Sequence, residues 1–363
     1  MKIKLQSLFI GLAIIAGVHQ VTAQVTNLGI APVAGSQSLL YWPVSTTNYV
    51  LQTVTNLTST NWVTARTAFA VNNAEVTNSA PSGFFRLMPT TVPAGMALIP
   101  AGWFTMGDTL DGEGDAIPTN IYVSAFVMDV NLVNYGLWTN VYAYATSQNY
   151  NFEDAGANGS TGTNYPVNTV DWFDCVKWCN ARSQLAGLTP VYYTDDGFTQ
   201  VFTNGDIGTT VYQNLAANGY RLPTEAEWEK AARGGCTGLR FPWGNLIHTN
   251  QAQYGACTWC YFYDLGPNNS PSGPSPVGSF DVNGYGLYDM AGNEFEWCWD
   301  WFGTPYGQPS TINPTGAGPE SGFRMLRGSY WGFHAVYARC ANRFGDNPSG
   351  DYEYCGFRCV RGL

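Results

Sequence analysis

Short apolar runs alternate with polar turns through the first part of the chain. Between residues 24 and 91, runs such as Leu39–Trp42 and Tyr49–Leu51 are separated by Asn/Ser/Thr turns, of which Asn72-Asn73 is the clearest. Short strands at this spacing are typical of small antiparallel sandwiches. We therefore predict a small all-β sandwich of about five to seven strands over residues 24–91. A short linker, Pro89–Gly95, follows it.

The remaining chain contains two segments with convincing helix signals. The first is Trp172–Leu185. The second follows Thr224, which can cap a helix and form a capping box with Glu227, while Gly234-Gly235 provides the stop. Elsewhere short apolar runs alternate with Gly and Pro. This pattern predicts an α+β domain with few helices, in which long loops carry the function.

The N-terminus has the pattern of a signal peptide. Lys2 and Lys4 precede the apolar run Leu8–Val18, and Val21-Thr22-Ala23 supplies the small residues that a signal peptidase needs. An apolar run of eleven residues is too short for a membrane helix, which needs about 20. No later segment is long and apolar enough for a transmembrane span. We expect residues 1–23 to be removed and the mature chain to be exported, to the periplasm or to the extracellular space.

Charge and composition limit the kinds of partner that the chain is expected to bind. The net charge is −10, and loss of the two lysines of the signal peptide makes it −12. Nucleic acid and anionic membranes bind clustered Lys and Arg, so neither is an expected partner. Aromatic residues make up 15% of the chain, charged residues only 12%, and there are 41 glycines. This composition suits a loop-rich fold in which aromatic side chains fill the gaps.

All nine cysteines lie between Cys175 and Cys359. In an oxidising compartment they predict a disulfide framework confined to the C-terminal domain. An odd number leaves at least one thiol unpaired or paired outside the chain. Cys257 and Cys260 have the spacing of a redox motif, but no βαβ pattern surrounds them. A structural role is favoured for this pair over a reactive dithiol.

Six ordered motifs then follow one another along the C-terminal domain. They are Met96–Gly107, Pro166–Cys179, Arg221–Asn245, Asn283–Trp297, Leu326–Trp331 and Gly356–Cys359. In this order they resemble the sulfatase-modifying factors, the family of the formylglycine-generating enzymes. The resemblance covers residues 96–363 and implies a loop-rich, C-type-lectin-like fold. Upstream, Leu51–Trp62 resembles fibronectin-like β modules, which act as spacers or bind carbohydrate.

The resemblance also implies a chemistry whose residues are missing here. Formylglycine-generating enzymes oxidise a sulfatase cysteine with oxygen, using copper held by two thiolates. Counting back from Cys340, which matches a structural cysteine of the family, places those thiols at Tyr330 and Ala335. No cysteine occurs between Trp299 and Arg339, so an insertion cannot restore the pair. We therefore expect neither copper nor the copper oxidase mechanism.

The last part of the domain matches the family's substrate groove. Aromatic side chains beside Arg and Asp suit stacking on sugars or holding an extended peptide. The predicted groove residues are Tyr330, Trp331, Phe333, His334, Tyr337, Arg343 and Asp346. Any of the aromatic residues could instead fill the core of a loop-rich fold. The first hypothesis is therefore a non-catalytic domain that binds a glycan or an extended peptide.

The second hypothesis is an enzyme, either a divergent formylglycine-generating oxidase or another metal-dependent oxidase. Cys257, Cys260 and Cys298 are its candidate thiols. A three-histidine iron site is excluded, because the mature chain retains only His248 and His334. Both histidines are more typical of hydrogen-bonded loop residues than of bases or ligands.

The resemblance further implies a structural calcium ion. The side chains of Asp289 and Glu296 and the carbonyls of Gly292 and Glu294 match a calcium site of the family, and such an oxygen set suits Ca²⁺. The alternative is a solvated acidic loop. The family's other calcium site keeps one candidate ligand here, Asn269.

Two disulfides are implied in the same way. Cys179 and Cys359 match the family's terminal disulfide, which would clip the first predicted helix to the end of the chain. Cys340 matches another bridged position, but its usual partner is replaced by Ala232. We expect Cys236, four residues further on, to take the place of that partner.

Overall fold

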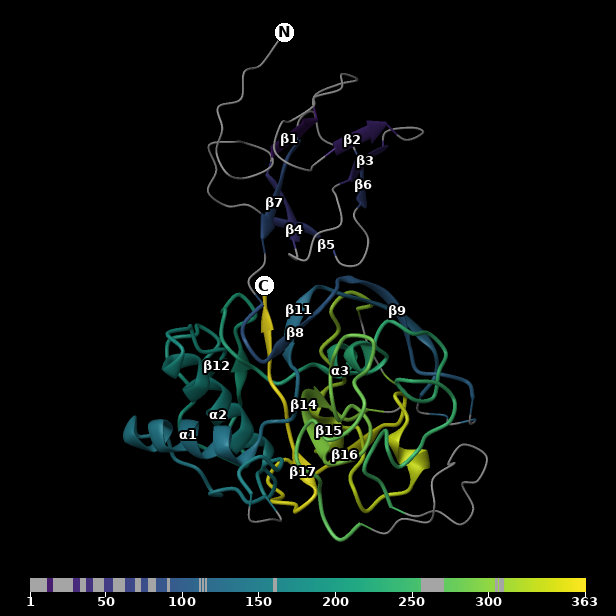
Figure 1. Cartoon of the computed structure of the whole chain (residues 1–363). Coiled ribbons are helices and arrows are strands. Elements are labelled where there is room, and N and C mark those ends of the chain that lie inside the picture. Colours follow the sequence, from purple (N-terminus) through teal and green to yellow (C-terminus); the bar gives the residue numbers. More distant parts are fainter. Residues whose placement is uncertain are drawn as a thin grey trace. The chain divides into compact units, whose positions relative to one another are not determined.

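The computed structural model describes residues 92–363, except for 111, 113, 115, 159–161, 256–270, 304–305 and 307–309; before residue 92 it describes the backbone of seven strands (Figure 1). The chain divides into two compact units, Met1–Pro93 and Ala94–Leu363. Within the described residues, no helix has both the length and the apolar character to cross a membrane.

The described strands of the first unit form two antiparallel sheets. Their strand orders are β1-β7-β4-β5 and β2-β3-β6. The strands are β1 Leu12–Ile15, β2 Gly29–Pro32, β3 Gln37–Tyr41, β4 Tyr49–Val54, β5 Val63–Ala68, β6 Asn73–Thr77 and β7 Gly83–Pro89. Strands β2 to β7 fall within residues 24–91, where the sequence predicts a sandwich, and β1 falls within the predicted signal peptide. The fibronectin-like character of this unit stays a prediction.

Three α-helices are described in the second unit. They are α1 Tyr135–Ser147, α2 Trp172–Leu185 and α3 Glu225–Ala232. Helices α2 and α3 were expected, and α3 begins with the predicted capping box of Thr224 and Glu227. Helix α1 was not expected. Its sequence includes Gly, Thr, Asn and Tyr, which are weak helix formers, and tertiary packing compensates for them.

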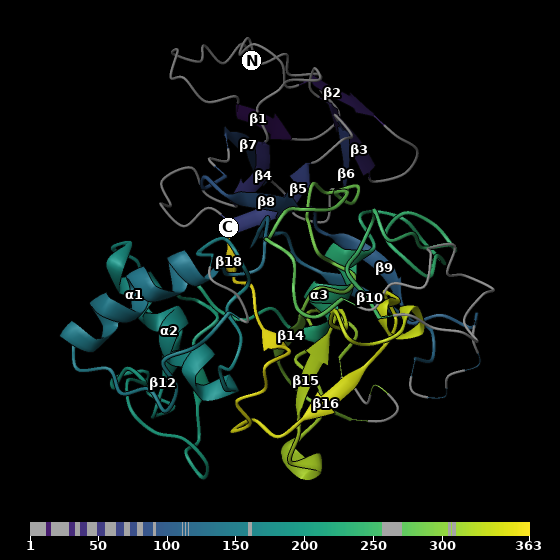
Figure 2. The ribbon, with the colours of Figure 1, turned by 60° about the horizontal axis from the view of Figure 1, so that its bottom comes forward.

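That packing comes from a neighbouring helix. Trp138 of α1 stacks on Trp178 of α2, with 5.7 Å between ring centroids and 4° between planes. Asn134 caps the start of α1 by accepting a hydrogen bond from the Leu137 N–H. The two helices lie side by side at one edge of the unit (Figures 1 and 2).

Short strands form four sheets in the described part of this unit. Their orders are β10-β9, β18-β11-β8, β12-β13 and β16-β15-β14-β17. The strands are β8 Met96–Ile99, β9 Gly102–Met106, β10 Thr119–Val123, β11 Phe126–Asp129, β12 Tyr192–Tyr193, β13 Tyr212–Gln213, β14 Phe295–Trp301, β15 Arg324–Arg327, β16 Phe344–Asp346, β17 Cys355–Gly356 and β18 Val360–Gly362. Two 3-10 helices, Pro319–Ser321 and Ala335–Ala338, lie in the connecting loops. In the three-stranded sheet, β11 pairs with both β8 and β18, which brings the two ends of the unit together.

Helix α3 anchors the loop-rich core through buried ion pairs. It packs between the β9–β10 pair and the β14–β15 strands (Figure 2). Glu225 pairs with Arg343 at 2.6 Å, and Glu229 pairs with Arg233 at 2.7 Å and also with Arg327. Buried charges persist when they are paired and hydrogen-bonded. The charged positions of the Arg221–Gly235 motif therefore hold the core together rather than face solvent.

Candidate functional site

A tight turn after β15 leads the chain to the outer surface of the unit. Gly328 and Ser329 both have positive φ angles, 92° and 71°, directly after the strand ends at Arg327. The chain then runs through residues 330–334 into the 3-10 helix Ala335–Ala338. A second loop, residues 347–354, lies against it. Together these loops form what we call the aromatic surface, which consists of Tyr330, Trp331, Phe333, Tyr337, Tyr352 and Tyr354.

The rings of the aromatic surface contact one another closely. Tyr330 lies 4.6 Å from Phe333 and 4.8 Å from Tyr354, measured between ring centroids. Tyr352 stacks on Tyr354 at 5.1 Å, and Phe333 contacts Tyr337 at 4.9 Å. The four predicted aromatic groove residues are therefore gathered on one surface. Tyr352 and Tyr354 were missed, because they lie in a turn in which the Cys355 N–H donates to the Tyr352 carbonyl and no periodic pattern marks them.

The edge of this surface is acidic. Asp346 accepts a hydrogen bond of 2.7 Å from the Tyr352 hydroxyl, and Asp351 and Glu353 are exposed nearby in the chain. Burial, followed by the neighbouring Cys355 and Asp346, raises the pKa of Tyr354 to about 12. The phenols therefore stay protonated at neutral pH and can act as neutral hydrogen-bonding groups beside their rings.

Arg343 does not belong to the aromatic surface, which corrects the sequence prediction. Its side chain is buried, and its guanidinium donates two hydrogen bonds to the Glu225 carboxylate, at 2.6 and 2.9 Å. It also donates to the Gly303 carbonyl. Arg343 therefore stabilises the core below the surface. His334 is half-buried and precedes the 3-10 helix, while its backbone bridges to Gly255.

The two positions that match the copper thiols hold no sulfur. Tyr330 is a member of the aromatic surface, and Ala335 is fully buried in a small apolar cluster. Cys298, a candidate thiol of the enzyme hypothesis, is also fully buried. Burial raises its pKa well above the usual range, which makes it a poor nucleophile. Cys257 and Cys260 lie outside the described residues, as does Asn269.

The expected calcium ligands lie in the loop before β14 and at the start of that strand. Asp289 has a positive φ of 57° and is buried. Its Oδ2 accepts a 2.9 Å hydrogen bond from the Gly278 N–H, whereas its Oδ1 is buried without a donor at full hydrogen-bond geometry, although the Asn293 side chain lies close enough to lower the pKa of Asp289 in part. Burial raises the pKa of Asp289 to about 6. A carboxylate oxygen that lacks a donor in the interior is the kind of group that a bound cation satisfies.

The other residues of the calcium set fit a cation in part. Glu296 accepts hydrogen bonds of 2.7 and 2.8 Å from Arg358, one at each oxygen, so each oxygen keeps a lone pair. The Glu294 carboxyl accepts from the Asn168 amide at 3.1 Å, and burial raises its pKa. Asp289 and Glu296 would therefore hold the ion with their side chains, and Gly292 and Glu294 with their backbone carbonyls.

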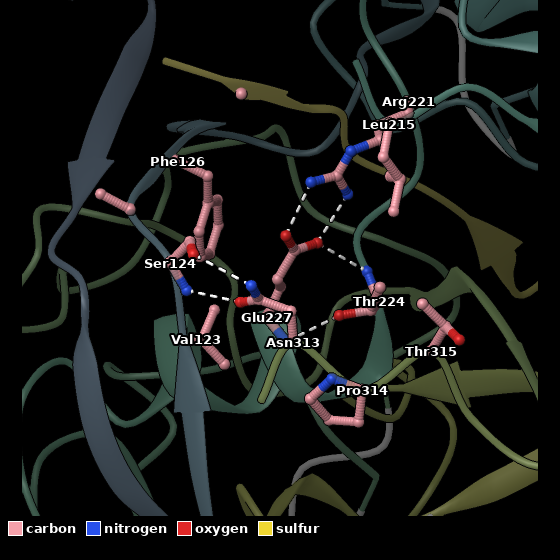
Figure 3. A pocket seen from close by; sticks show the side chains of 12 residues that line it. Val123, Ser124, Phe126, Leu215, Arg221, Thr224, Glu227, Asn313, Pro314 and Thr315 are labelled. Carbon is pink, nitrogen blue, oxygen red and sulfur yellow. Dashed lines mark hydrogen bonds and ion pairs between the residues drawn. The ribbon is translucent and has the colours of Figure 1, made fainter. Parts of the chain in front are cut away.

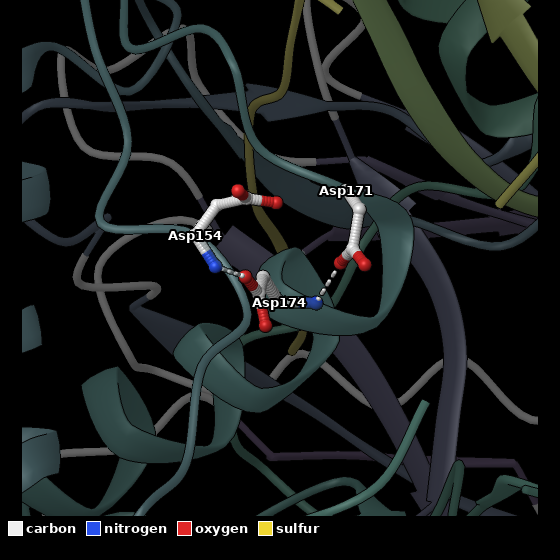
Figure 4. Close-up of side chains that lie close together, drawn as sticks. All are labelled: Asp154, Asp171 and Asp174. Carbon is white, nitrogen blue, oxygen red and sulfur yellow. Dashed lines mark hydrogen bonds between the residues drawn. The ribbon is translucent and has the colours of Figure 1, made fainter. Parts of the chain in front are cut away.

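Three carboxylates form a separate acidic cluster at the start of α2 (Figure 4). Asp154, Asp171 and Asp174 each place an oxygen within 4.8 Å of the others. Asp171 caps α2 by accepting from the Asp174 N–H at 2.6 Å, and Asp174 lies 2.7 Å from the Lys177 ammonium. Burial raises the pKa of Asp171 to about 8 and that of Asp154 to about 6. No sequence motif singles out this cluster.

A small cavity of about 240 Å³ lies between the β10–β11 turn, the start of α3 and the segment 313–315 (Figure 3). Phe126 and Pro314 form part of its apolar lining. Arg221 and Glu227 line one side and pair with each other at 2.6 and 2.7 Å. Since their charges compensate each other, the cavity offers no unpaired charge for catalysis.

Of the two expected disulfides, the structure brings the cysteines of one close together but not those of the other. Cys179 and Cys359 are both buried, and their sulfurs lie 3.5 Å apart. Cys236 and Cys340 are not joined: Cys236 is exposed after the turn that ends α3, whereas Cys340 is buried in the core. The expected Cys236–Cys340 pair is therefore corrected. A cysteine shifted four residues from Ala232 lies beyond the end of the helix and no longer faces the core.

The loop-rich α+β fold and the motifs around α3 and β14 define a C-type-lectin-like domain of the formylglycine-generating-enzyme type. A family model for the sulfatase-modifying factor enzyme 1-like domain matches residues 81–363, and the chain belongs to this family. The formylglycine-generating enzyme of Bos taurus is 31% identical over 297 residues, which cover 75% of this chain and 78% of the relative. That of Thermomonospora curvata is 30% identical over 298 residues, which cover 76% of this chain and 96% of the relative.

Solved structures agree with this assignment. Treponema denticola variable protein 1 is 29% identical and superposes with a TM-score of 0.57, covering 73% of this chain and 94% of its own. The crystal structure of CarF, at 24% identity and a TM-score of 0.56, shares the fold and covers 75% of this chain and 99% of its own. The predicted family and fold class are therefore confirmed.

Proposed function

We propose that this family member is an exported, non-catalytic binding protein whose aromatic surface holds a glycan or an extended peptide. The observation that carries the proposal is the cluster of six half-buried or exposed rings on two adjacent loops. Rings that keep part of their surface in water can stack on sugar rings or on apolar peptide side chains. Tyr330 and Ala335 occupy the positions of the copper thiols, which supports binding without oxidation.

The charge of the aromatic surface favours some ligands over others. Its edge carries Asp346, Asp351 and Glu353, while Arg343 is buried against Glu225. Like charges on a ligand would be repelled, because the mature chain is also strongly acidic. The ligand is therefore neutral or positively charged, such as an uncharged oligosaccharide or a peptide that carries Lys or Arg.

A structural calcium ion belongs to the same proposal. Asp289 Oδ1 is buried without a donor, and the nearby Glu296 is the second carboxylate of the set. Calcium takes six to eight oxygen ligands and combines carboxylates with backbone carbonyls. Bound at Asp289, Gly292, Glu294 and Glu296, the ion would fix the loop that leads into β14. Phe295 of that strand contacts Tyr330 at 5.8 Å, so the ion also supports the aromatic surface.

Alanine substitutions test the binding surface. The mature protein is screened against neutral oligosaccharides, sulfated oligosaccharides, and extended peptides that carry either Lys or Glu. Trp331→Ala and Tyr337→Ala should each weaken binding of the best ligand by about 10-fold or more, because central aromatic residues dominate binding energies. The melting temperature should change little for Tyr337→Ala, whose side chain is 37% exposed.

A matched control separates binding from general surface effects. Tyr212 lies on β13 and is also 37% exposed, so Tyr212→Ala removes an equivalent ring elsewhere. Binding should survive this change. If binding survives Trp331→Ala and Tyr337→Ala as well, the aromatic surface is not the binding site. Preference for sulfated ligands would contradict the argument from charge.

A further inference from the structure

Besides the carboxyl oxygens of Asp289 and Glu294, another buried oxygen without a hydrogen-bond donor lies close to the proposed calcium site. It is Oδ1 of Asn131, in the segment that connects β11 to α1. An amide oxygen buried without a donor is destabilising, so such groups usually have a partner. Asn131 was not singled out by the sequence, because its segment lies far from the calcium loop along the chain.

Two hydrogen bonds and one close approach bring Asn131 and Asp289 near each other. The Tyr288 N–H donates to the Val130 carbonyl at 2.9 Å, which aligns the residues that precede each of them. Gly278 contacts both: its N–H donates to Asp289 Oδ2, and a Cβ at this glycine would lie 3.1 Å from Asn131 Oδ1. The Asp289 carboxylate and the Asn131 amide oxygen therefore flank a single glycine, and each side chain has one buried oxygen without a hydrogen-bond donor.

We propose that Asn131 supplies a further side-chain oxygen to the calcium ion bound at Asp289. The inference rests on the calcium site of the proposed function and extends it to a separate segment of the chain. One divalent cation satisfies both orphaned oxygens at once, and neutral amide oxygens are normal ligands of Ca²⁺. The ion thereby ties the β11–α1 connection to the loop before β14.

A rival arrangement uses the same residues without a cation. Oxygen and nitrogen of an amide are nearly indistinguishable in shape, so a turned Asn131 amide could donate from its NH₂ group to Asp289 Oδ1. A substitution that adds a negative charge at Asn131 distinguishes the two arrangements. An oxygen ligand can be replaced by a carboxylate, whereas a carboxylate in place of a donor would repel Asp289.

The experiment is a calcium titration of the full mature protein after removal of metal with a chelator, followed by isothermal calorimetry. Asp289→Asn should abolish binding at this site. Asn131→Ala should lower the calcium affinity about 10-fold, and Asn131→Asp should retain or raise it, because a charged oxygen replaces a neutral one. Asn120→Ala, an exposed change on β10, is the control and should bind as the unchanged protein does.

The outcomes separate the two proposals. If Asp289→Asn binds calcium normally, the proposed calcium site itself is wrong. If Asp289→Asn abolishes binding and Asn131→Ala does not weaken it, only the role of Asn131 is wrong. If Asn131→Asp loses calcium binding while its circular dichroism spectrum shows a folded protein, Asn131 acts as a donor to Asp289 and the inference is overturned.

Discussion

At the scale of single residues, the acidic cluster at α2 makes stability depend on pH. Burial, followed by the charge of Asp174, raises the pKa of Asp171 to about 8, well above that of an unfolded aspartate. The native state therefore binds more protons than the unfolded chain between about pH 4 and 8, and the free energy of unfolding falls as pH rises through this range. Asp171→Asn keeps the oxygen that caps α2 and removes the titration.

We predict that Asp171→Asn flattens this dependence and stabilises the protein at pH 8 by up to about 5 kcal/mol, the amount that a pKa raised from 3.8 to about 8 gives. Urea denaturation at pH 5 and pH 8 measures the effect. Asp281→Asn on an exposed loop is the control and should leave the pH dependence unchanged. If the free energy of unfolding changes with pH by the same amount in Asp171→Asn and in the unchanged protein, Asp171 is ionised at neutral pH and the charge of Lys177 compensates it.

At the scale of elements, helix α3 depends on its cap. Thr224 Oγ1 accepts a 3.2 Å hydrogen bond from the Glu227 N–H, and Glu227 accepts in return from the Thr224 N–H. Thr224→Ala should lower the free energy of unfolding by about 1 kcal/mol. Thr224→Ser retains the capping hydroxyl and should keep most of this stabilisation. Chemical denaturation of both variants measures the difference. Equal losses in the two variants would assign the effect to the buried methyl group instead.

Elements with strong local signals could be predicted, and those made by packing could not. The sequence predicts the capping box that begins helix α3 and the glycines that follow its end, and both are found in the structure. Helix α1 has an Asn cap but a poor helical sequence, and it depends on the Trp138–Trp178 stack. Such a contact between distant residues leaves no periodic pattern in either segment.

The residues of the candidate site also fall into two groups, those that the sequence predicts and those that only tertiary packing places. The segment 330–337 was predicted because it matches a family motif, and its rings lie together. Arg343 was assigned to the surface because its segment matches the family's substrate groove, but its side chain is buried and pairs with Glu225. Tyr354 and Asn131 reach their places only through tertiary contacts, so neither could be assigned from the sequence.

At the scale of the whole molecule, the chain end is held to α2. The sulfurs of Cys179 and Cys359 lie 3.5 Å apart although the residues are 180 positions apart in the sequence. A disulfide between them would close this long loop and, in the chain-entropy model, stabilise the native state by about 5 kcal/mol, less any strain. Free thiols exchange with disulfides as thiolates, so thiols must be trapped in acid to avoid exchange during analysis.

We predict that protein isolated from an oxidising compartment contains this disulfide. Peptide mapping after alkylation in acid should recover Cys179 joined to Cys359. The double substitution Cys179→Ala with Cys359→Ala should lower the melting temperature strongly, since the C-terminal strand β18 completes the sheet with β8 and β11. Cys236→Ala, a change at an exposed thiol, should have little effect. Recovery of both buried cysteines as free thiols would instead mean that packing of the chain end against α2 is enough to hold it.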